Sequence, residues 1–258
     1  MHKYYVIPNL NKIDKYLDLS KKYDLGFEYN DFFEPSLLDD EEKLEKTLKS
    51  ALKLGRVNDT LHGVFYDIVL DSSDSKIAKI SYDRVKSSLD IASKLKCKGV
   101  VFHTNYLTWM KTDFYRNNWV NKNKEIYLKL IEEYKDLEIY IENMFDLDPY
   151  LLERLIKEIN HPRIGVCLDI AHASISNVEI DEWFRVLGKF IKHIHINDND
   201  RISDSHSELG KGIIDYRNAY KYINSLKQDI SILIEIKDYD KTVNSINYLK
   251  EGKFDDIK

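Results

Sequence analysis

Eight times along this sequence a short apolar run is followed by an amphipathic stretch, and this alternation restricts the chain to few folds. The stretch Tyr82–Lys96, for example, places Val85, Leu89, Ala92 and Leu95 on one stripe, as a helix covering a sheet does. Alternating strands and helices predict a parallel sheet, and eight such units close into a barrel. We therefore expect an α/β fold, a single (β/α)8 TIM barrel that spans residues 1–258 as one domain.

The expected strands are nearly continuous in hydrophobicity, which is typical of strands covered on both faces. They are Tyr5–Pro8, Gly26–Tyr29, Thr60–Phe65, Gly99–Thr104, Glu138–Met144, Ile164–Ile170, Ile191–Asn197 and Ser231–Ile236.

Most of these strands end in a side chain that can bind a metal or move a proton. The residues are His62, His103, Glu142, Asp169, His195 and Glu235. Because the carboxyl ends of all barrel strands surround one mouth, we expect these six side chains to converge there. His193 shares a face with His195 but lies one layer deeper, so we expect it inside the barrel and not among the ligands.

Composition and charge exclude several classes of function. The chain has a net charge of -5, which offers no general attraction for nucleic acid or anionic lipid. No apolar run is long enough for a membrane span. The two cysteines, Cys97 and Cys167, lie in or beside apolar runs and indicate buried thiols in a reducing compartment. We expect a cytoplasmic enzyme without a membrane partner. A nucleic-acid partner is disfavoured but stays open, as does a homodimer.

Three further residues join the expected mouth. His172 lies three positions after Asp169, and Asp204 lies two positions before His206. Imidazoles and carboxylates that converge without a cation would be costly to desolvate, so a bound divalent metal is the economical explanation. Mixed His and carboxylate ligands suit Zn²⁺ or Mn²⁺, and the nine residues allow one to three ions.

Two long connections follow strands on the same side of the barrel. Tyr106–Trp119 carries Trp109, and Asp198–Gly212 carries Lys211. Long loops there usually shape a substrate pocket, but the aromatic residues could equally pack the first loop down, so its role as a lid stays open. We expect Trp109 and Asn143 to contact substrate. Lys211 is either a phosphate ligand or an ordinary surface lysine.

Two motifs carry a family resemblance. The segment Gly165-Val166-Cys167-Leu168-Asp169-Ile170-Ala171-His172-Ala173 resembles a signature of the endonuclease IV family, which has Thr where Ile170 stands. His195-Ile196-Asn197-Asp198-Asn199, with Asp204-Ser205-His206 and Leu209-Gly210-Lys211-Gly212, is similar to the next signature. Here the spacer is short, and Ser205 replaces the expected Arg. The resemblance implies that all nine His, Asp and Glu residues bind metal.

The chain also resembles the wider group of xylose isomerase-like barrels, which includes sugar phosphate isomerases and epimerases. Those enzymes use a glutamate, an aspartate, a histidine and a second glutamate on successive strands. The matching residues are Glu142, Asp169, His195 and Glu235. The resemblance therefore implies a divalent-metal-dependent isomerase or epimerase of a small sugar or sugar phosphate, with Glu142 and Glu235 exchanging the proton.

The alternative is an endonuclease IV-like phosphodiesterase that acts at abasic sites in DNA. The full ligand set supports it, but DNA binding needs a positively charged groove, and basic residues near the expected mouth are few. We therefore favour the isomerase or epimerase of a small sugar or sugar phosphate. A sensor that binds metal or sugar without turnover ranks third, because Glu142 and Glu235 supply an acid and a base.

Overall fold

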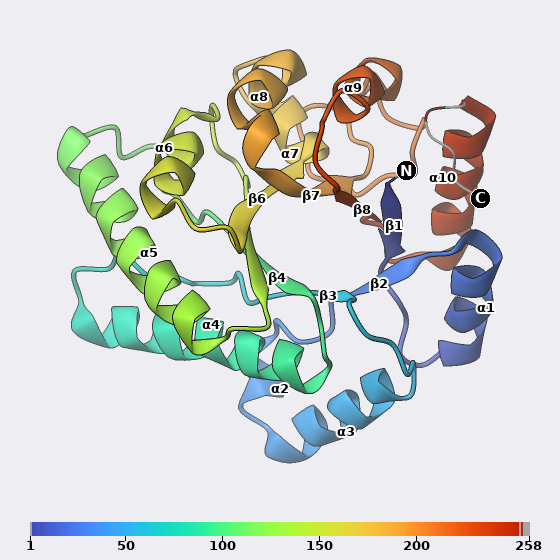
Figure 1. The fold of residues 1–258 in the computed structure, drawn as a ribbon, viewed down its shortest axis with the longest axis horizontal. Helices are drawn as coiled ribbons and strands as arrows, with labels where there is room; N and C mark the ends of the chain where they lie inside the picture. The colour runs from blue at the N-terminus through green and yellow to red at the C-terminus, as the bar shows by residue number, and fades with distance from the viewer. Residues whose placement is uncertain (1, 253, 255–258) are drawn as a thin grey trace. The chain divides into compact units, whose positions relative to one another are not determined.

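The order of strands in the computed structural model, which describes residues 2–252 and 254, is that of a closed parallel barrel. Hydrogen-bonded neighbours follow the chain order from β1 to β8 (Figure 1). The expected (β/α)8 fold is confirmed. The strands are β1 Lys3–Val6, β2 Gly26–Tyr29, β3 Thr60–His62, β4 Gly99–His103, β5 Glu138–Glu142, β6 Ile164–Asp169, β7 Ile191–Ile196 and β8 Ser231–Ile234.

Helices fill the connections between successive strands. They are α1 Ile13–Tyr23, α2 Pro35–Leu38, α3 Glu41–Leu52, α4 Ser75–Lys94, α5 Asp113–Glu133, α6 Tyr150–Ile159, α7 Ile170–Ile175, α8 Ile180–Leu187, the short 3-10 helix η1 Gly188–Phe190, α9 Tyr216–Ile223 and α10 Tyr239–Gly252.

Several bounds differ from those expected. The first strand is Lys3–Val6 because Lys3 pairs with Ser231 of β8, whereas Pro8 has no N–H to donate to a sheet. The loop after β4 is shorter than expected because α5 already begins at Asp113. There the Thr112 side chain caps the helix by accepting a hydrogen bond from the Tyr115 N–H at 3.3 Å.

The residues form two compact units. The first unit comprises residues 1–28, 143–149 and 166–258, and the second unit comprises residues 29–142 and 150–165. One domain over 1–258 stays a prediction.

In the first unit, β7 pairs with β6 and β8, and β1 pairs with β8 and β2. The register places Asp169 beside His195, and Ile234 beside Ile196. Parallel pairing in this register brings the ends of β6, β7 and β8 to one level, which is where their polar residues lie.

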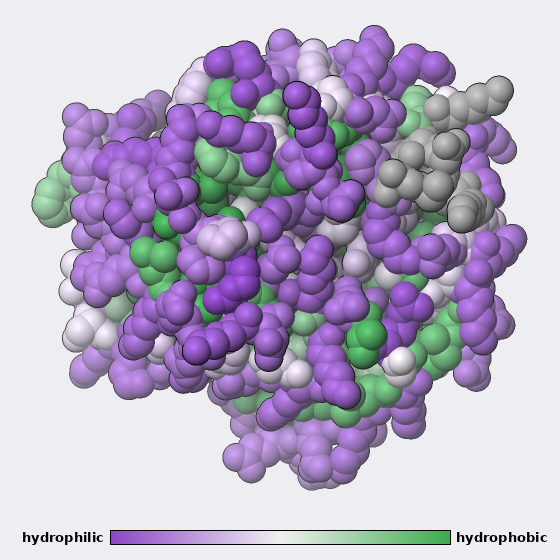
Figure 2. Space-filling view, in the orientation of Figure 1, coloured by the Kyte–Doolittle hydropathy of each residue, from purple (hydrophilic) through white to green (hydrophobic). Residues whose placement is uncertain are grey.

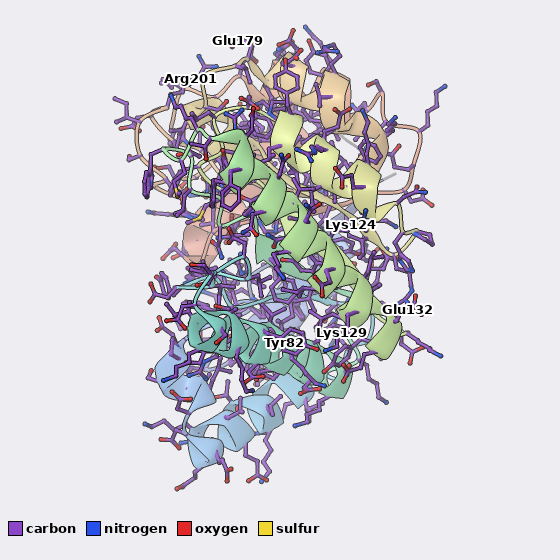
Figure 3. All side chains as sticks on the ribbon, turned by 90° about the vertical axis from the view of Figure 1, so that its left-hand side faces the viewer. Tyr82, Lys124, Lys129, Glu132, Glu179 and Arg201 are labelled. Atoms are coloured by element: carbon purple, nitrogen blue, oxygen red, sulfur yellow. The ribbon has the colours of Figure 1, made fainter. Side chains whose placement is uncertain are left out.

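In the second unit, β4 pairs with β3 and β5, and His103 lies beside Glu142 in the register. On the outside, α5 carries charged contacts to its neighbours (Figure 3). The Lys129 ammonium lies 4.8 Å from the ring centre of Tyr82 on α4, and Lys124 lies 3.7 Å from Glu158 on α6. Such exposed contacts add little stability compared with the buried apolar faces beneath them.

The surface agrees with the composition. Hydrophilic residues dominate the face drawn in Figure 2, with hydrophobic side chains scattered among them.

Among the described residues, we find no helix with the length and apolar content that crossing a membrane requires. Cys97 and Cys167 are both buried and reduced, as predicted.

Candidate metal centre

The second unit brings together three of the predicted residues, each the last of its strand: His62, His103 and Glu142. The Nε2 atoms of His62 and His103 lie 3.5 and 3.4 Å from the same oxygen of Glu142, Oε2. All three side chains are buried. Two imidazoles and a carboxylate thus converge on a small space, which is a donor set that suits Zn²⁺.

The first unit brings together Asp169, His195 and Glu235. Asp169 ends β6, His195 is the penultimate residue of β7, and Glu235 directly follows β8. Each offers one ligand atom, and these atoms lie within 4.8 Å of one another. Nδ1 of His195 lies 3.4 Å from Oε2 of Glu235. These are three of the four residues that the sugar isomerase resemblance names; the fourth, Glu142, belongs to the second unit.

A further group in the first unit is supplied by loops. Oδ2 of Asp204 lies 3.2 Å from Nε2 of His172 and 3.1 Å from Nε2 of His206. His206 also lies beside Glu235, with its Nδ1 3.0 Å from the main-chain oxygen of that residue. The segment that carries Asp204 and His206 therefore joins the strand-end residues of its unit.

The hydrogen bonds of the histidines decide which nitrogen can bind a metal. Nδ1 of His62, His172 and His206 lies 2.9–3.0 Å from the main-chain oxygens of Gly63, Asn143 and Glu235, respectively. A carbonyl oxygen only accepts, so each Nδ1 carries a proton, and Nε2 is the nitrogen that a metal would bind. In all three residues it is Nε2 that faces a carboxylate of the candidate site.

The charge state of the Asp204 group follows from its contacts. Burial acts to raise the pKa of Asp204, but hydrogen bonds from His172 and His206 outweigh it and hold that pKa below its usual range. Burial likewise acts to lower the pKa of His206, but the hydrogen bond to Asp204 and the charge of Glu235 raise it to about 10. Without a metal, His206 is thus the cation that balances these carboxylates.

Asn143 stands directly after β5, and its side chain is bound to the backbone of β6. Its Nδ2 donates to the main-chain oxygen of Asp169, and its Oδ1 accepts from the N–H of Asp169, both at 2.9 Å. This pair of bonds fixes the end of β6, where Asp169 also caps α7 by accepting from the N–H of His172 at 2.6 Å. Substrate binding by Asn143 stays a prediction.

The two predicted loop residues lie at the surface. Trp109 has 73% of its surface exposed and belongs to the second unit, and Lys211 is exposed in the first. Two other aromatic residues of the expected loop, Tyr115 and Trp119, belong to α5 and are buried. Trp119 Nε1 donates a hydrogen bond to the Thr104 carbonyl at 3.2 Å. Packing thus accounts for those two aromatics, while the roles of Trp109 and Lys211 remain predictions.

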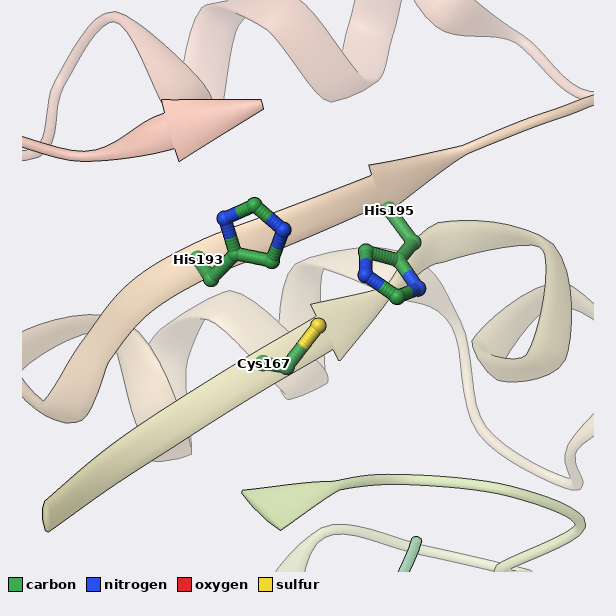
Figure 4. A group of neighbouring side chains, drawn as sticks. All are labelled: Cys167, His193 and His195. Carbon is green, nitrogen blue, oxygen red and sulfur yellow. The ribbon is translucent and has the colours of Figure 1, made fainter. Parts of the chain in front are cut away.

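Beneath the strand ends of the first unit lies a deeper polar group that includes Glu28, which the sequence analysis missed. Figure 4 shows Cys167 on β6 pointing toward the imidazoles of His193 and His195 on β7. Glu28 of β2 lies 3.1 Å from Nε2 of each histidine. The signal available in the sequence was a charged residue between Phe27 and Tyr29 in a short expected strand, and the structure shows every position of that strand buried.

The chemistry of the strand-end and loop groups fits divalent metals. These groups offer imidazole nitrogens and carboxylate oxygens, which Zn²⁺ and Mn²⁺ accept, and the deeper group adds the thiol of Cys167 to two imidazoles. Oδ1 of Asp204, moreover, is buried and has no hydrogen-bond partner among the residues that the structure describes. Such an atom is costly unless a cation or a ligand satisfies it.

Comparison with known proteins finds relatives by sequence. The uncharacterised protein MJ1614 of Methanocaldococcus jannaschii is 33% identical over 196 residues, which cover 74% of this chain and 76% of that protein. A probable endonuclease 4 of Mycoplasma mobile is 31% identical over 142 residues, 45% of this chain and 50% of that protein.

Among solved structures, a D-tagatose 3-epimerase-like protein superimposes with a TM-score of 0.77 at 21% identity, covering 96% of both chains. A Thermus thermophilus protein soaked with ZnCl2 has a TM-score of 0.74 at 19% identity, covering 97% of this chain and 96% of the other. At these identities the likeness shows the fold alone. Residues 20–252 match the xylose isomerase-like TIM barrel family, and the chain belongs to that family.

Proposed function

We propose that this protein is a divalent-metal-dependent isomerase or epimerase of a small sugar or sugar phosphate. The observation that carries the proposal is the buried group of Asp169, His195 and Glu235, which offers two carboxylates and one imidazole within 4.8 Å of one another. With Glu142, these residues make up the ligand set that the sequence shares with sugar isomerases and epimerases. The proposal includes Zn²⁺ or Mn²⁺ as the metal and a cytoplasmic location.

Each residue has a role in this proposal. Asp169 and His195 hold the ion, and a divalent ion held there would polarise a carbonyl and its neighbouring hydroxyl, which acidifies the carbon between them. Glu142 and Glu235 contribute ligand oxygens and also exchange the proton at that carbon as acid and base. Both are buried, and a dry environment strengthens the interaction of a carboxylate with the proton that it moves.

A second function is favoured by a specific observation. His172, Asp204 and His206 form a separate group, which matches the additional ligands of the endonuclease IV resemblance. A multi-metal phosphodiesterase acting at abasic sites in DNA would use them to hold a further ion and activate water. The net charge of -5 disfavours this function, because duplex DNA is bound largely through contacts between basic side chains and its negatively charged phosphates.

Solvent exchange into a substrate tests the first proposal. The protein loaded with Zn²⁺ or Mn²⁺ is incubated in D2O with a panel of ketopentoses, ketohexoses and their phosphates. We expect deuterium at the carbon next to the carbonyl of one substrate. Glu142→Gln and Glu235→Gln should slow the exchange by about 10²–10⁴-fold. Glu179→Gln is the control, because that side chain is 78% exposed.

Two outcomes would contradict the proposal. Isomerisation without entry of solvent label would indicate a hydride shift and would exclude proton exchange by the two glutamates. Cleavage of an abasic duplex by the loaded protein, with no exchange into any sugar, would establish the phosphodiesterase instead. The duplex assay is run at several salt concentrations, because phosphate contacts weaken steeply as salt rises.

A further inference from the structure

Asn197 directly follows β7, and its side chain is completely buried. Neither its Oδ1 nor its Nδ2 has a hydrogen-bond partner among the residues that the structure describes. A buried amide that makes no hydrogen bond destabilises the folded protein, and native structures contain few such groups. The chain thus leaves one donor and one acceptor of Asn197 available to a bound molecule.

A second buried asparagine lies two residues further on, and it uses both ends of its amide. Nδ2 of Asn199 donates to the main-chain oxygen of Ala171 at 2.9 Å. Its Oδ1 accepts from the N–H of Arg201 at 2.9 Å and from the hydroxyl of Ser174 at 3.0 Å. The fold therefore provides partners for a buried amide in this segment, but not for that of Asn197.

The backbone of Asn197 is held on both sides. Its main-chain oxygen accepts a hydrogen bond from the hydroxyl of Tyr216, which is buried. The next residue, Asp198, exchanges two main-chain hydrogen bonds with Ser207, both at 2.8 Å. Because the backbone is fixed, little freedom would be lost when the amide binds a ligand, and such preorganisation favours binding.

The position of Asn197 along β7 places it beyond the candidate metal ligand His195. The sheet continues to this level, because the main-chain oxygen of Ile196 accepts from the N–H of Glu235 at 2.9 Å. Side chains alternate along a strand, so Asn197 shares the face of His195 and lies about 7 Å closer to the mouth. A substrate that reaches the ion of the proposed function from the mouth would pass this amide.

We propose that Asn197 is a substrate-binding residue whose amide binds two neighbouring oxygens of a polyhydroxy substrate. Its Nδ2 donates to one oxygen, and its Oδ1 accepts from the hydroxyl of the next. The inference rests on the proposed function and adds a residue that contacts the substrate and not the ion. Hydroxyl groups match an amide because each both donates and accepts, whereas the oxygens of an ionised phosphodiester only accept.

Solvent exchange by the metal-loaded variant Asn197→Ala tests the inference. For the sugar that exchanges deuterium with the wild-type protein, we expect kcat/KM to fall by about 10–100-fold, the loss of two hydrogen bonds between neutral groups. The fall should come mainly from a higher KM, because the amide binds substrate without taking part in proton transfer. Asn244→Ala is the control, since Asn244 is exposed.

Monodeoxy analogues of that sugar identify the hydroxyl that the amide binds. We expect one analogue to react more slowly than the parent sugar with the wild-type protein. With Asn197→Ala this difference should disappear, because the variant has no amide to distinguish the two compounds. If every analogue were slowed by the same factor in both proteins, the inference would be overturned.

Stability separates a binding role from a structural one. Asn199→Ala leaves the partners of Asn199 without their hydrogen bonds, whereas Asn197→Ala removes an amide that has none among the described residues. We therefore expect Asn199→Ala to lower the free energy of unfolding clearly more than Asn197→Ala does, measured by denaturant titration. Equal destabilisation by the two substitutions would show that the amide of Asn197 supports the fold, and would overturn the inference.

The remaining outcomes distinguish this inference from the proposed function. If no sugar of the panel exchanges deuterium with the wild-type protein, the proposed function fails and the inference fails with it. If a sugar exchanges and Asn197→Ala acts on it with the wild-type kcat/KM, the inference alone fails.

Discussion

At the scale of single residues, Asn143 holds the backbone at the end of β6, where Asp169 lies. Replacing it with alanine removes both hydrogen bonds to the Asp169 backbone and leaves a buried N–H and a buried carbonyl unsatisfied. We expect Asn143→Ala to lower the free energy of unfolding by about 2–4 kcal/mol, measured by denaturant titration. Asn244→Ala is the control, because Asn244 is exposed. Equal stability of the two variants would contradict this role.

The contact between Asp204 and His206 predicts how stability depends on pH in the metal-free protein. The pKa of His206 is raised from 6.5 to about 10, so its contribution is complete below pH 6.5 and is lost as the pH rises through 10. The pKa of Asp204 is lowered from 3.8, so its contribution is lost as the pH falls below that value.

We therefore expect Asp204→Asn to be most destabilising between about pH 4 and 6.5, and the difference from wild type to vanish above about pH 10. Denaturant unfolding across this range, in the presence of a chelator, measures it. An NMR titration should also show the midpoint of His206 falling toward 6.5 in the variant. A destabilisation that persisted undiminished to pH 11 would show that the charge of His206 is not its cause.

At the scale of elements, the loop after β7 is organised by Asp198. Oδ2 of Asp198 accepts from the N–H of Gly210 at 2.9 Å, and Oδ1 accepts from the N–H of Ile214 at 3.2 Å. Gly212 lies so close to this arrangement that an added Cβ would lie 2.3 Å from the main-chain oxygen of Asn199.

We expect Gly212→Ala to destabilise the protein by about 1–3 kcal/mol, because backbone cannot move aside as a side chain can. Its unfolding is measured by denaturant, and limited proteolysis reports on the loop. Gly188→Ala is the control, since an added Cβ there meets only a Leu226 side-chain carbon at 3.4 Å. If Gly212→Ala matched this control in both measurements, the close approach would not constrain the loop.

At the scale of the whole molecule, a bound ion should stabilise the fold by mass action. Free Zn²⁺ or Mn²⁺ at one hundred times its dissociation constant adds about 2.7 kcal/mol to the free energy of unfolding. We expect a higher melting temperature with metal, reversed by EDTA, and a smaller shift in Asp169→Asn and His195→Gln. Ser231→Ala should keep the full shift. The absence of a shift with either metal would contradict the metal site.

The sequence by itself predicted the barrel and the placement of the strand-end residues. The strand and helix periods are local properties, and a residue that ends an apolar run must lie at the end of its strand. His62, His103 and Asp169 are accordingly the last residues of β3, β4 and β6. The motif resemblance then added Asp204 and His206, which no periodicity could place.

Only the tertiary structure decided how these residues are held. Glu28 is separated from His193 and His195 by more than half of the sequence, and nothing local to β2 indicates that a carboxylate there lies 3.1 Å from two imidazoles of β7. The tautomers likewise depend on which carbonyl or carboxylate each ring meets. The physical reason is that hydrogen bonding is directional and short in range, so it is set by packing, whereas the strand period is fixed by the backbone alone.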